Sequence, residues 1–271
     1  MSYEKRTILL IVEAYPEVSK RYGNTVCTAG VLEDTNELVR IYPISYNTFQ
    51  RKKLGKFIRI SALIKRNTEE KLKRKESYKI NEASIKIIDK SLKNTRIKGV
   101  LEKRKKIIEK FLTPSVEILE NKYYQDKTSI GIIKPILQTI KFQTKRPIEE
   151  IDIKVSNKVQ EDLFGVKFKQ PDRIEKAFFY HFKCFGENCK YHDKICTDWE
   201  LYQSFRKWRK KYITPDELEK KLKEKYEDWM KSRDLFFILG THSQFPTWFI
   251  IGLFYPPKPG GKDLFDFIKK R

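Results

Sequence analysis

The N-terminal part of the chain alternates between short apolar runs and turn-forming residues. Apolar or alternating stretches of strand length occur at residues 7–14, 25–32, 38–42 and 57–65, and a shorter stretch follows at 84–88. Residues that favour turns separate them, as in Tyr22-Gly23-Asn24. Because the runs are short and closely spaced, the pattern predicts a small antiparallel sheet or a partly closed barrel.

Helical spacing first occurs at residues 99–112. The apolar side chains at positions 100, 101, 107, 108, 111 and 112 share one face of a helix. This helix is expected to end before Pro114, because a residue that precedes proline avoids the α region. A second short helix is predicted at 115–120, whereas the apolar stretch 130–142 has no clear period.

The C-terminal part mixes both patterns. We expect strands at 176–182, 235–239 and 247–255, helices that begin at Thr197 and Thr214, and a last short helix after the break at 256–261. Residues 143–173 are polar and contain two prolines, which indicates a join. The sequence therefore predicts an α+β protein with a β-rich, basic part at 1–145, a connecting segment at 146–173, and an α/β part at 174–271 organised around a Cys/His metal site.

The cysteines support that metal site. Three of the four fall close together beside a histidine, in the order Cys184-x4-Cys189-x2-His192-x3-Cys196. Cys3His is a recognised structural zinc set, because thiolates and imidazole suit a tetrahedral ion of intermediate softness. We therefore predict one zinc ion on these four residues; an iron–sulfur cluster or unligated thiols are the alternatives. Cys27 lies on an apolar strand and is expected to be a core residue.

The charge changes the functional picture. Among 271 residues, 58 are basic and 36 are acidic, so the formal net charge is +22. Such a surplus repels itself, and a polyanionic partner is the usual reason for it. Genome composition is the alternative, but that bias enriches Lys and Glu together. We therefore predict a protein that binds DNA or RNA, mainly through the phosphate backbone.

Basic side chains gather in two places, the loops of the N-terminal part and the end of the helix after Thr197. The candidate phosphate-contacting residues are Lys20, Arg21, Arg40, Arg51, Lys52, Lys53 and Arg74 in the first place, and Arg206, Lys207, Arg209, Lys210 and Lys211 in the second. Solvated charge is the alternative at both, because cations at a helix C-terminus also offset the helix dipole.

An enzymatic function stays open. Asp198 and Glu200 next to a metal would suit a nuclease, but Thr-x-x-Glu from Thr197 to Glu200 is also a capping box, and the same motif recurs at Thr214. Capping with Thr197 as N-cap is the interpretation we favour. His242 is a third candidate catalytic residue. A metal-dependent nuclease or base- or RNA-modifying enzyme is thus the alternative function, and a regulatory or partner-docking protein is the second.

No feature of the sequence indicates a membrane segment. The apolar run at 7–12 lacks a signal-peptide cleavage site, and the longest apolar stretch, Trp248 to Tyr255, is far shorter than the about 20 residues needed to span a bilayer. Four cysteines in a chain of this size do not form a disulfide framework. We expect a cytoplasmic protein, and the oligomeric state is left open.

Overall fold

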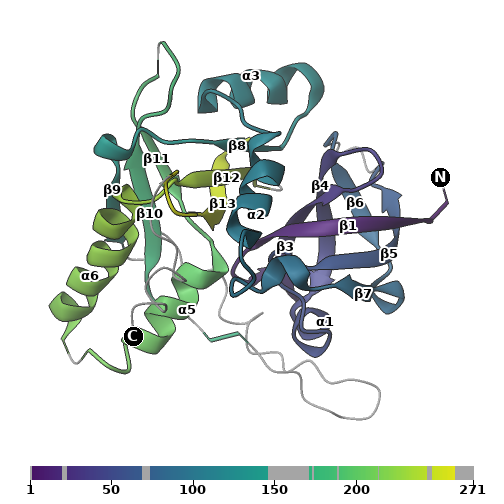
Figure 1. The fold of residues 1–271 in the computed structure, drawn as a ribbon, viewed down its shortest axis with the longest axis horizontal. Helices are drawn as coiled ribbons and strands as arrows, with labels where there is room; N and C mark the ends of the chain where they lie inside the picture. The colour runs from purple at the N-terminus through teal and green to yellow at the C-terminus, as the bar shows by residue number, and fades with distance from the viewer. Residues whose placement is uncertain are drawn as a thin grey trace.

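Strands and helices are interspersed along the described chain (Figure 1). The computed structural model describes residues 2–19, 23–68, 74–145, 171–172, 174–187, 189–212, 214–242 and 246–259. The mixture of strands and helices agrees with the predicted α+β class. Most of the expected connecting segment and the expected last helix lie outside the described residues.

The N-terminal strands form a closed barrel. Its strands are β1 (Glu4–Glu13), β3 (Gly23–Leu32), β4 (Glu37–Ser45), β5 (Arg59–Arg66) and β6 (Ser77–Ile80). They pair in the order β1-β3-β4-β6-β5, and β5 pairs back with β1. All of these pairs are antiparallel except β4 with β6. The strand spacing predicted a small antiparallel sheet or a partly closed barrel; the structure has a closed barrel with one parallel pair.

Smaller elements surround the barrel. They are β2 (Glu17–Ser19), α1 (Tyr46–Arg51), β7 (Lys86–Asp89) and the 3-10 turns η2 (Glu82–Ser84) and η3 (Ser91–Lys93). β2 pairs with β3, and β7 pairs with β5. Ser45 caps α1 by accepting a hydrogen bond from the Thr48 amide.

The C-terminal half contains two three-stranded sheets. One has the order β11-β10-β9 and the other β13-β12-β8. The strands are β8 (Ile130–Ile133), β9 (Lys141–Lys145), β10 (Ala177–Phe182), β11 (His192–Ile195), β12 (Phe236–Thr241) and β13 (Trp248–Phe254), with the 3-10 turn η4 (Leu137–Thr139). β8 and β9 thus pair with strands that lie far beyond residue 145. The domain boundaries drawn from the sequence stay a prediction.

The helices lie close to where the sequence placed them. They are α2 (Val100–Glu109), α3 (Val116–Asp126), α5 (Trp199–Trp208), α6 (Pro215–Lys223) and the π-helical η5 (Glu224–Trp229) that continues α6. Thr214 and Glu217 form the predicted capping box of α6. At α5 the prediction needs correction: Asp198, not Thr197, is the N-cap, because its carboxylate accepts from the amides of Glu200 and Leu201. Among the described helices, none combines the length and apolar character that crossing a bilayer requires.

The barrel and the C-terminal sheets share a core. Side chains of β1 alternate between two directions, so that Ile8 and Leu10 fill the barrel. Leu9 and Ile11 pack outward, in one cluster with residues of β12 and β13 such as Ile238. Both faces of β1 are therefore buried, which explains its nearly continuous apolar sequence.

Candidate metal centre and basic surface

Four side chains place their ligand atoms within 4.8 Å of one another: Glu117, Cys184, Cys189 and His192. The two Sγ atoms are 3.0 Å apart, and His192 Nε2 lies 3.5 Å from Cys184 Sγ and 3.2 Å from Cys189 Sγ. The Glu117 carboxylate closes the group, with Oε1 3.2 Å from His192 Nε2 and Oε2 3.6 Å from Cys184 Sγ. We call these four residues the metal group.

Three elements position the metal group. Cys184 and Cys189 lie in the turn between β10 and β11, and His192 is the first residue of β11. Glu117 is in the first turn of α3, which Ser115 caps. A Cβ added at Gly186 would lie 2.9 Å from Ser115 Cβ, so the absence of a side chain lets the cysteine turn approach the start of α3. The cysteine turn thereby lies close to Glu117, which comes from another part of the chain.

Cys196 is not part of the metal group, which corrects the predicted ligand set. Cys196 is fully buried in the C-terminal core, and its amide donates to Phe178 O. His192 and Cys196 are separated by the length of β11, and four residues of strand span about 13 Å. Two ligands of one ion lie much closer than that, so Glu117 and not Cys196 is the fourth member of the metal group.

The donor atoms suit a metal ion. Tetrahedral bonds of about 2.0–2.3 Å place neighbouring ligand atoms roughly 3.3–3.8 Å apart, close to the distances within the metal group. Glu117 Oε1 is buried and, among the described residues, accepts no well-aligned hydrogen bond, which suits an atom whose partner is an ion. The group could therefore hold a metal ion.

The ionisation of the metal group would change on binding a cation. Burial, together with the hydrogen bond to Cys189, raises the pKa of Cys184 to about 12. Burial lowers the pKa of His192, which keeps the imidazole in the neutral form that binds metals. A bound cation would deprotonate the thiols. The amides of Val116 and Cys184 already donate to Cys184 Sγ and Cys189 Sγ, which stabilises thiolates.

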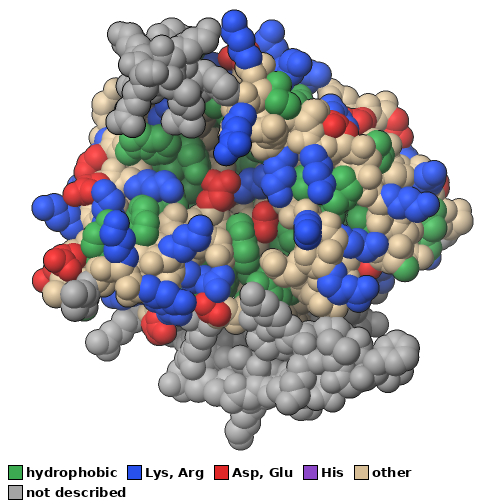
Figure 2. Space-filling model, turned by 60° about the horizontal axis from the view of Figure 1, so that its bottom comes forward, with side chains coloured by type: hydrophobic (Ala, Val, Ile, Leu, Met, Phe, Trp, Pro, Cys, Tyr) green, Lys and Arg blue, Asp and Glu red, His purple; other side chains and the backbone are tan. Residues whose placement is uncertain are grey.

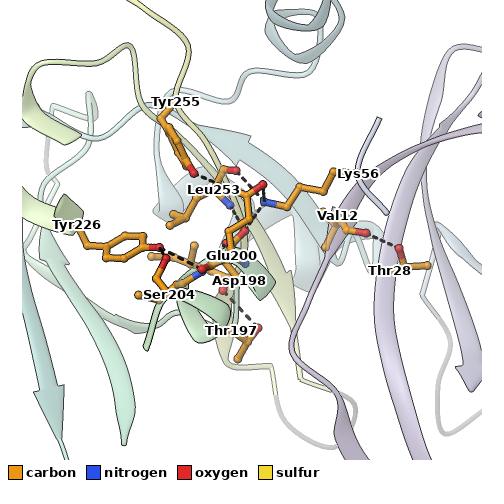
Figure 3. A network of polar contacts seen from close by, with 12 residues as sticks. Val12, Thr28, Lys56, Thr197, Asp198, Glu200, Ser204, Tyr226, Leu253 and Tyr255 are labelled. Carbon is orange, nitrogen blue, oxygen red and sulfur yellow. Dashed lines mark hydrogen bonds and ion pairs between the residues drawn. The ribbon is translucent and has the colours of Figure 1, made fainter. Parts of the chain in front are cut away.

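Two of the weak catalytic candidates belong to a buried network elsewhere (Figure 3). Asp198 Oδ2 accepts from Lys56 Nζ at 2.6 Å and from the Leu253 amide at 2.9 Å, while Asp198 Oδ1 caps α5. Glu200 pairs with Lys56 at 3.6 Å and accepts a hydrogen bond from the Tyr255 hydroxyl. Since both Asp198 oxygens are engaged by protein groups, this carboxylate has a structural role.

The basic residues predicted at the end of α5 divide into two kinds. Arg206 pairs with Asp172 at 2.6 Å, and Arg209 pairs with Glu175 at 3.0 Å. Lys207, Lys210 and Lys211 are exposed, and none of them forms an ion pair with a described residue. These three lysines are the residues of this cluster whose charge is open to a partner.

The N-terminal candidates are spread over different environments. Arg51 and Lys53 are exposed, whereas Lys52 is half-buried and donates to Ile85 O at 2.9 Å. Arg40 and Arg74 line a cavity between the barrel and the C-terminal half, together with His242 and Cys27. Lys20 and Arg21 lie outside the described residues. His242, the third catalytic candidate, is thus part of a site different from that of Asp198 and Glu200.

A further basic stretch, which the sequence reasoning missed, runs along η3 and α2. The exposed residues are Lys90, Lys93, Arg96, Lys98, Lys103, Lys106 and Lys110. Two buried neighbours on α2 are held by the protein: Arg104 donates to Leu92 O at 2.6 Å, and Lys105 pairs with Asp234 at 2.9 Å. The density of Lys and Arg between residues 90 and 110 is a signal in the sequence, but the prediction for this stretch rested only on the apolar spacing at 99–112.

The α2 stretch adds to a surface that is basic in general. On the face that Figure 2 shows, Lys and Arg side chains predominate over Asp and Glu. In Figure 1, α2 lies between the barrel and the C-terminal sheets, and its buried side chains pack into the core that both share. The exposed lysines of α2 are thus held on a rigid element.

Comparison with known protein families divides the chain after α2. Residues 4–110 match the family described as Domain of unknown function (DUF8758), and residues 112–269 match Domain of unknown function (DUF8757). The second match covers more than half of the chain, so the chain belongs to the DUF8757 family. All residues of the metal group lie inside that match. A search of curated proteins found no match.

Proposed function

We propose that this member of the DUF8757 family binds DNA or RNA through the phosphate backbone and carries a structural zinc ion in its metal group. The observation that carries the binding proposal is the set of exposed lysines and arginines on η3, α2 and the end of α5, which form no ion pair with a described residue, in a chain of net charge +22. Contacts of this kind release condensed counterions and supply affinity without sequence preference.

The barrel supports the same proposal at the level of fold analogy. Its strand order, with a single parallel pair between the third and the fifth barrel strands, is that of the OB-fold. OB-fold barrels often bind oligonucleotides. Folds host many functions, so this argument adds to the charge argument and does not replace it.

Zinc is the metal that the donor set favours. Two thiolates, one imidazole and one carboxylate together give four protein ligands, which is the coordination number of structural zinc sites. Iron–sulfur clusters are held mainly by cysteine thiolates, and the metal group offers two. With all four positions taken by the protein, the ion would tie the cysteine turn to α3.

The binding proposal is tested by the salt dependence of affinity. We expect the chain to bind labelled duplex DNA and single-stranded RNA, with a log–log slope of about −0.9 per phosphate contacted on the duplex. The triple change Lys103→Ala, Lys106→Ala and Lys110→Ala, and the triple change of Lys207, Lys210 and Lys211 to Ala, should each reduce both affinity and slope.

A matched control lies on α6. Changing Lys220, Lys221 and Lys223 to Ala removes the same number of positive charges. These lysines lie among the acidic residues Glu217, Glu219 and Glu224. This control should change the slope much less than the other two triple variants. No binding to either nucleic acid at low salt, or an equal loss in the control, would contradict the proposal.

A further inference from the structure

A cavity of about 90 Å³ lies between the barrel and the C-terminal half. Its walls come from β3, β4 and β6 on one side and from β12 and β13 on the other. Three basic side chains line it: Arg40 on β4, Arg74 just before β6, and His242 directly after β12. This cavity is separate from the exposed lysines of the proposed function and from the metal group.

Arg40 is fixed in the cavity by neutral groups. It is 6% exposed, and Nη1 donates to Thr241 O at 2.9 Å and to Ser129 O at 3.2 Å. Nη2 lies 3.5 Å from Cys27 Sγ. Carbonyl oxygens satisfy the donors of this guanidinium but carry no charge, and the carboxylates of Glu17 and Glu76 act on it only through space, without an ion pair. The geometry therefore positions a full positive charge inside the protein.

Arg74 brings a second charge to the same place. It donates a hydrogen bond to His242 O. Burial lowers the pKa of Arg74 to about 10, and the neighbouring Arg40 acts in the same direction. Among the described residues, neither arginine forms an ion pair with a carboxylate. Glu76 is a partial counter-charge, but it is already engaged by the amide and hydroxyl of Ser129. Two like charges in a confined space are stabilised by a bound anion.

We infer that this cavity binds the phosphate group of a nucleotide, held by Arg40 and Arg74. Guanidinium groups match phosphate oxygens in geometry and charge. Tyr78 and Phe249 line the same cavity and offer aromatic surface for a base. Glu17 also lines it, and an acidic side chain is a common acceptor for sugar hydroxyls in nucleotide sites. The nucleotide can be free or the 5′-terminal residue of a strand, and the second source rests on the proposed function.

Calorimetric titration of the full chain distinguishes the sources. One arm compares AMP with adenosine and with inorganic phosphate, and the other compares 5′-phosphorylated with 5′-hydroxyl oligonucleotides. We expect AMP, or the 5′-phosphorylated strand, to bind about tenfold or more tightly than its unphosphorylated counterpart, because charged hydrogen bonds are lost without the phosphate. Preference in the AMP arm identifies a free nucleotide, and preference only in the strand arm identifies a 5′ end.

Arg74→Gln is the main variant, because Arg74 is less buried than Arg40 and its substitution disturbs fewer backbone contacts. This variant should bind the preferred ligand about tenfold or more weakly, and its melting temperature should be unchanged. The triple alanine variant of Lys207, Lys210 and Lys211 should leave AMP affinity unchanged, since these lysines do not line the cavity.

A second measurement uses the native chain and its own thiol. Cys27 is partly exposed in the cavity, beside Arg40. Bound ligand should slow alkylation of Cys27 by iodoacetamide several-fold, as read by peptide mass, while adenosine should not. Equal binding of phosphorylated and unphosphorylated ligands, with no protection of Cys27, overturns the inference. Salt-dependent binding of long nucleic acids would survive that result, so failure here and failure of the proposed function are distinguishable.

Discussion

Lys56 and Asp198 are 142 positions apart in the sequence, and their side chains form an ion pair of 2.6 Å in the interior of the protein. The Lys56 side chain is 8% exposed and that of Asp198 is 0% exposed. Although burial lowers it, the carboxylates of Asp198 and Glu200 hold the pKa of Lys56 above its ordinary value. The pair joins the segment before β5 of the barrel to the start of α5.

Replacing Lys56 should destabilise the whole chain. Lys56→Met leaves Asp198 as a buried charge without a counter-charge, and such changes lower the free energy of unfolding by about 3–5 kcal/mol. Urea denaturation followed by circular dichroism measures the loss. The control is Lys53→Met, three residues earlier at an exposed site, which should change stability little. Similar losses in both variants would show that the pair contributes nothing specific.

Alanine substitutions of Asp198 and of Glu200 should differ strongly in their effect on stability. Asp198→Ala removes the cap of α5 together with the contacts to Lys56 and Leu253, so the loss should exceed the about 0.5–2 kcal/mol of a cap alone. The Glu200 side chain is 47% exposed, and Glu200→Ala should alter stability by about 1 kcal/mol or less. Denaturation of the two variants side by side makes the comparison, and an equal effect would contradict the structural role assigned to Asp198.

Glu13 should make stability depend on pH. Burial raises the pKa of Glu13 from 4.5 to about 7. Because the folded pKa is the higher one, the associated stability is fully present below about pH 4.5 and is lost as the pH rises towards 7. Glu13→Gln has no carboxylate to ionise, so its free energy of unfolding does not show this loss. Relative to the native chain, the variant should become more stable as the pH rises from 4.5 to 7, and the difference above pH 7 should be roughly 1–3 kcal/mol.

Thermal melting at pH 4.5, 6 and 8 tests this prediction. The control Glu102→Gln changes an exposed carboxylate on α2 and should run parallel to the native chain. A constant difference between Glu13→Gln and the native chain across the pH series would contradict the assignment.

Metal content should depend on the four residues of the metal group and not on the predicted Cys3His set. Elemental analysis of chain purified without chelator should give one zinc per native chain, and much less for Cys189→Ser and Glu117→Ala. Cys196→Ser should retain the metal, because Cys196 lies outside the group. If Glu117→Ala retained zinc and Cys196→Ser lost it, the result would support the Cys3His set instead. Stoichiometric iron with visible absorption would contradict zinc.

The position of α3 should control metal retention without any change of ligand. A Cβ at Gly131 would lie 2.3 Å from Leu119 Cδ2, so Gly131→Ala must shift the buried Leu119 side chain, and we expect α3 to move with the Glu117 that it carries. We expect faster zinc loss to a chelator, measured with a chromogenic indicator. Gly252→Ala is the control, since its nearest contact would be an ordinary 3.4 Å. Equal rates in both variants would show that α3 does not hold a ligand.

Metal removal should affect nucleic-acid binding only indirectly. β11 begins at His192, and α5 follows within a few residues and ends beside Lys207, Lys210 and Lys211. Loss of the ion frees the cysteine turn, so α5 should become less protected from amide hydrogen exchange. Chelated chain should therefore bind DNA or RNA less tightly, and added zinc should restore the affinity. Unchanged exchange and affinity after metal removal would contradict a structural ion.

Local sequence patterns determined the elements of this protein. The short apolar runs of β1 and β3, the caps of α3 and α6, and the turn residues between strands act over a few residues, so they can be read without the fold. The same holds for Cys184, Cys189 and His192, which one turn brings together. The strands β8, β9 and β11 were not anticipated: β8 is buried at all four positions and has no period of two, and β9 and β11 are only five and four residues long.

Only the tertiary structure decided which distant side chains meet. Glu117 reaches Cys184 over 67 residues, and the sequence offered Cys196 as the nearer candidate. Arg40 has the pattern of a surface residue next to a polar turn, yet the C-terminal strands cover it and enclose it with Arg74. The physical reason is that burial of a charge or a ligand depends on how sheets pair and pack over long separations, and local preferences carry no information about that pairing.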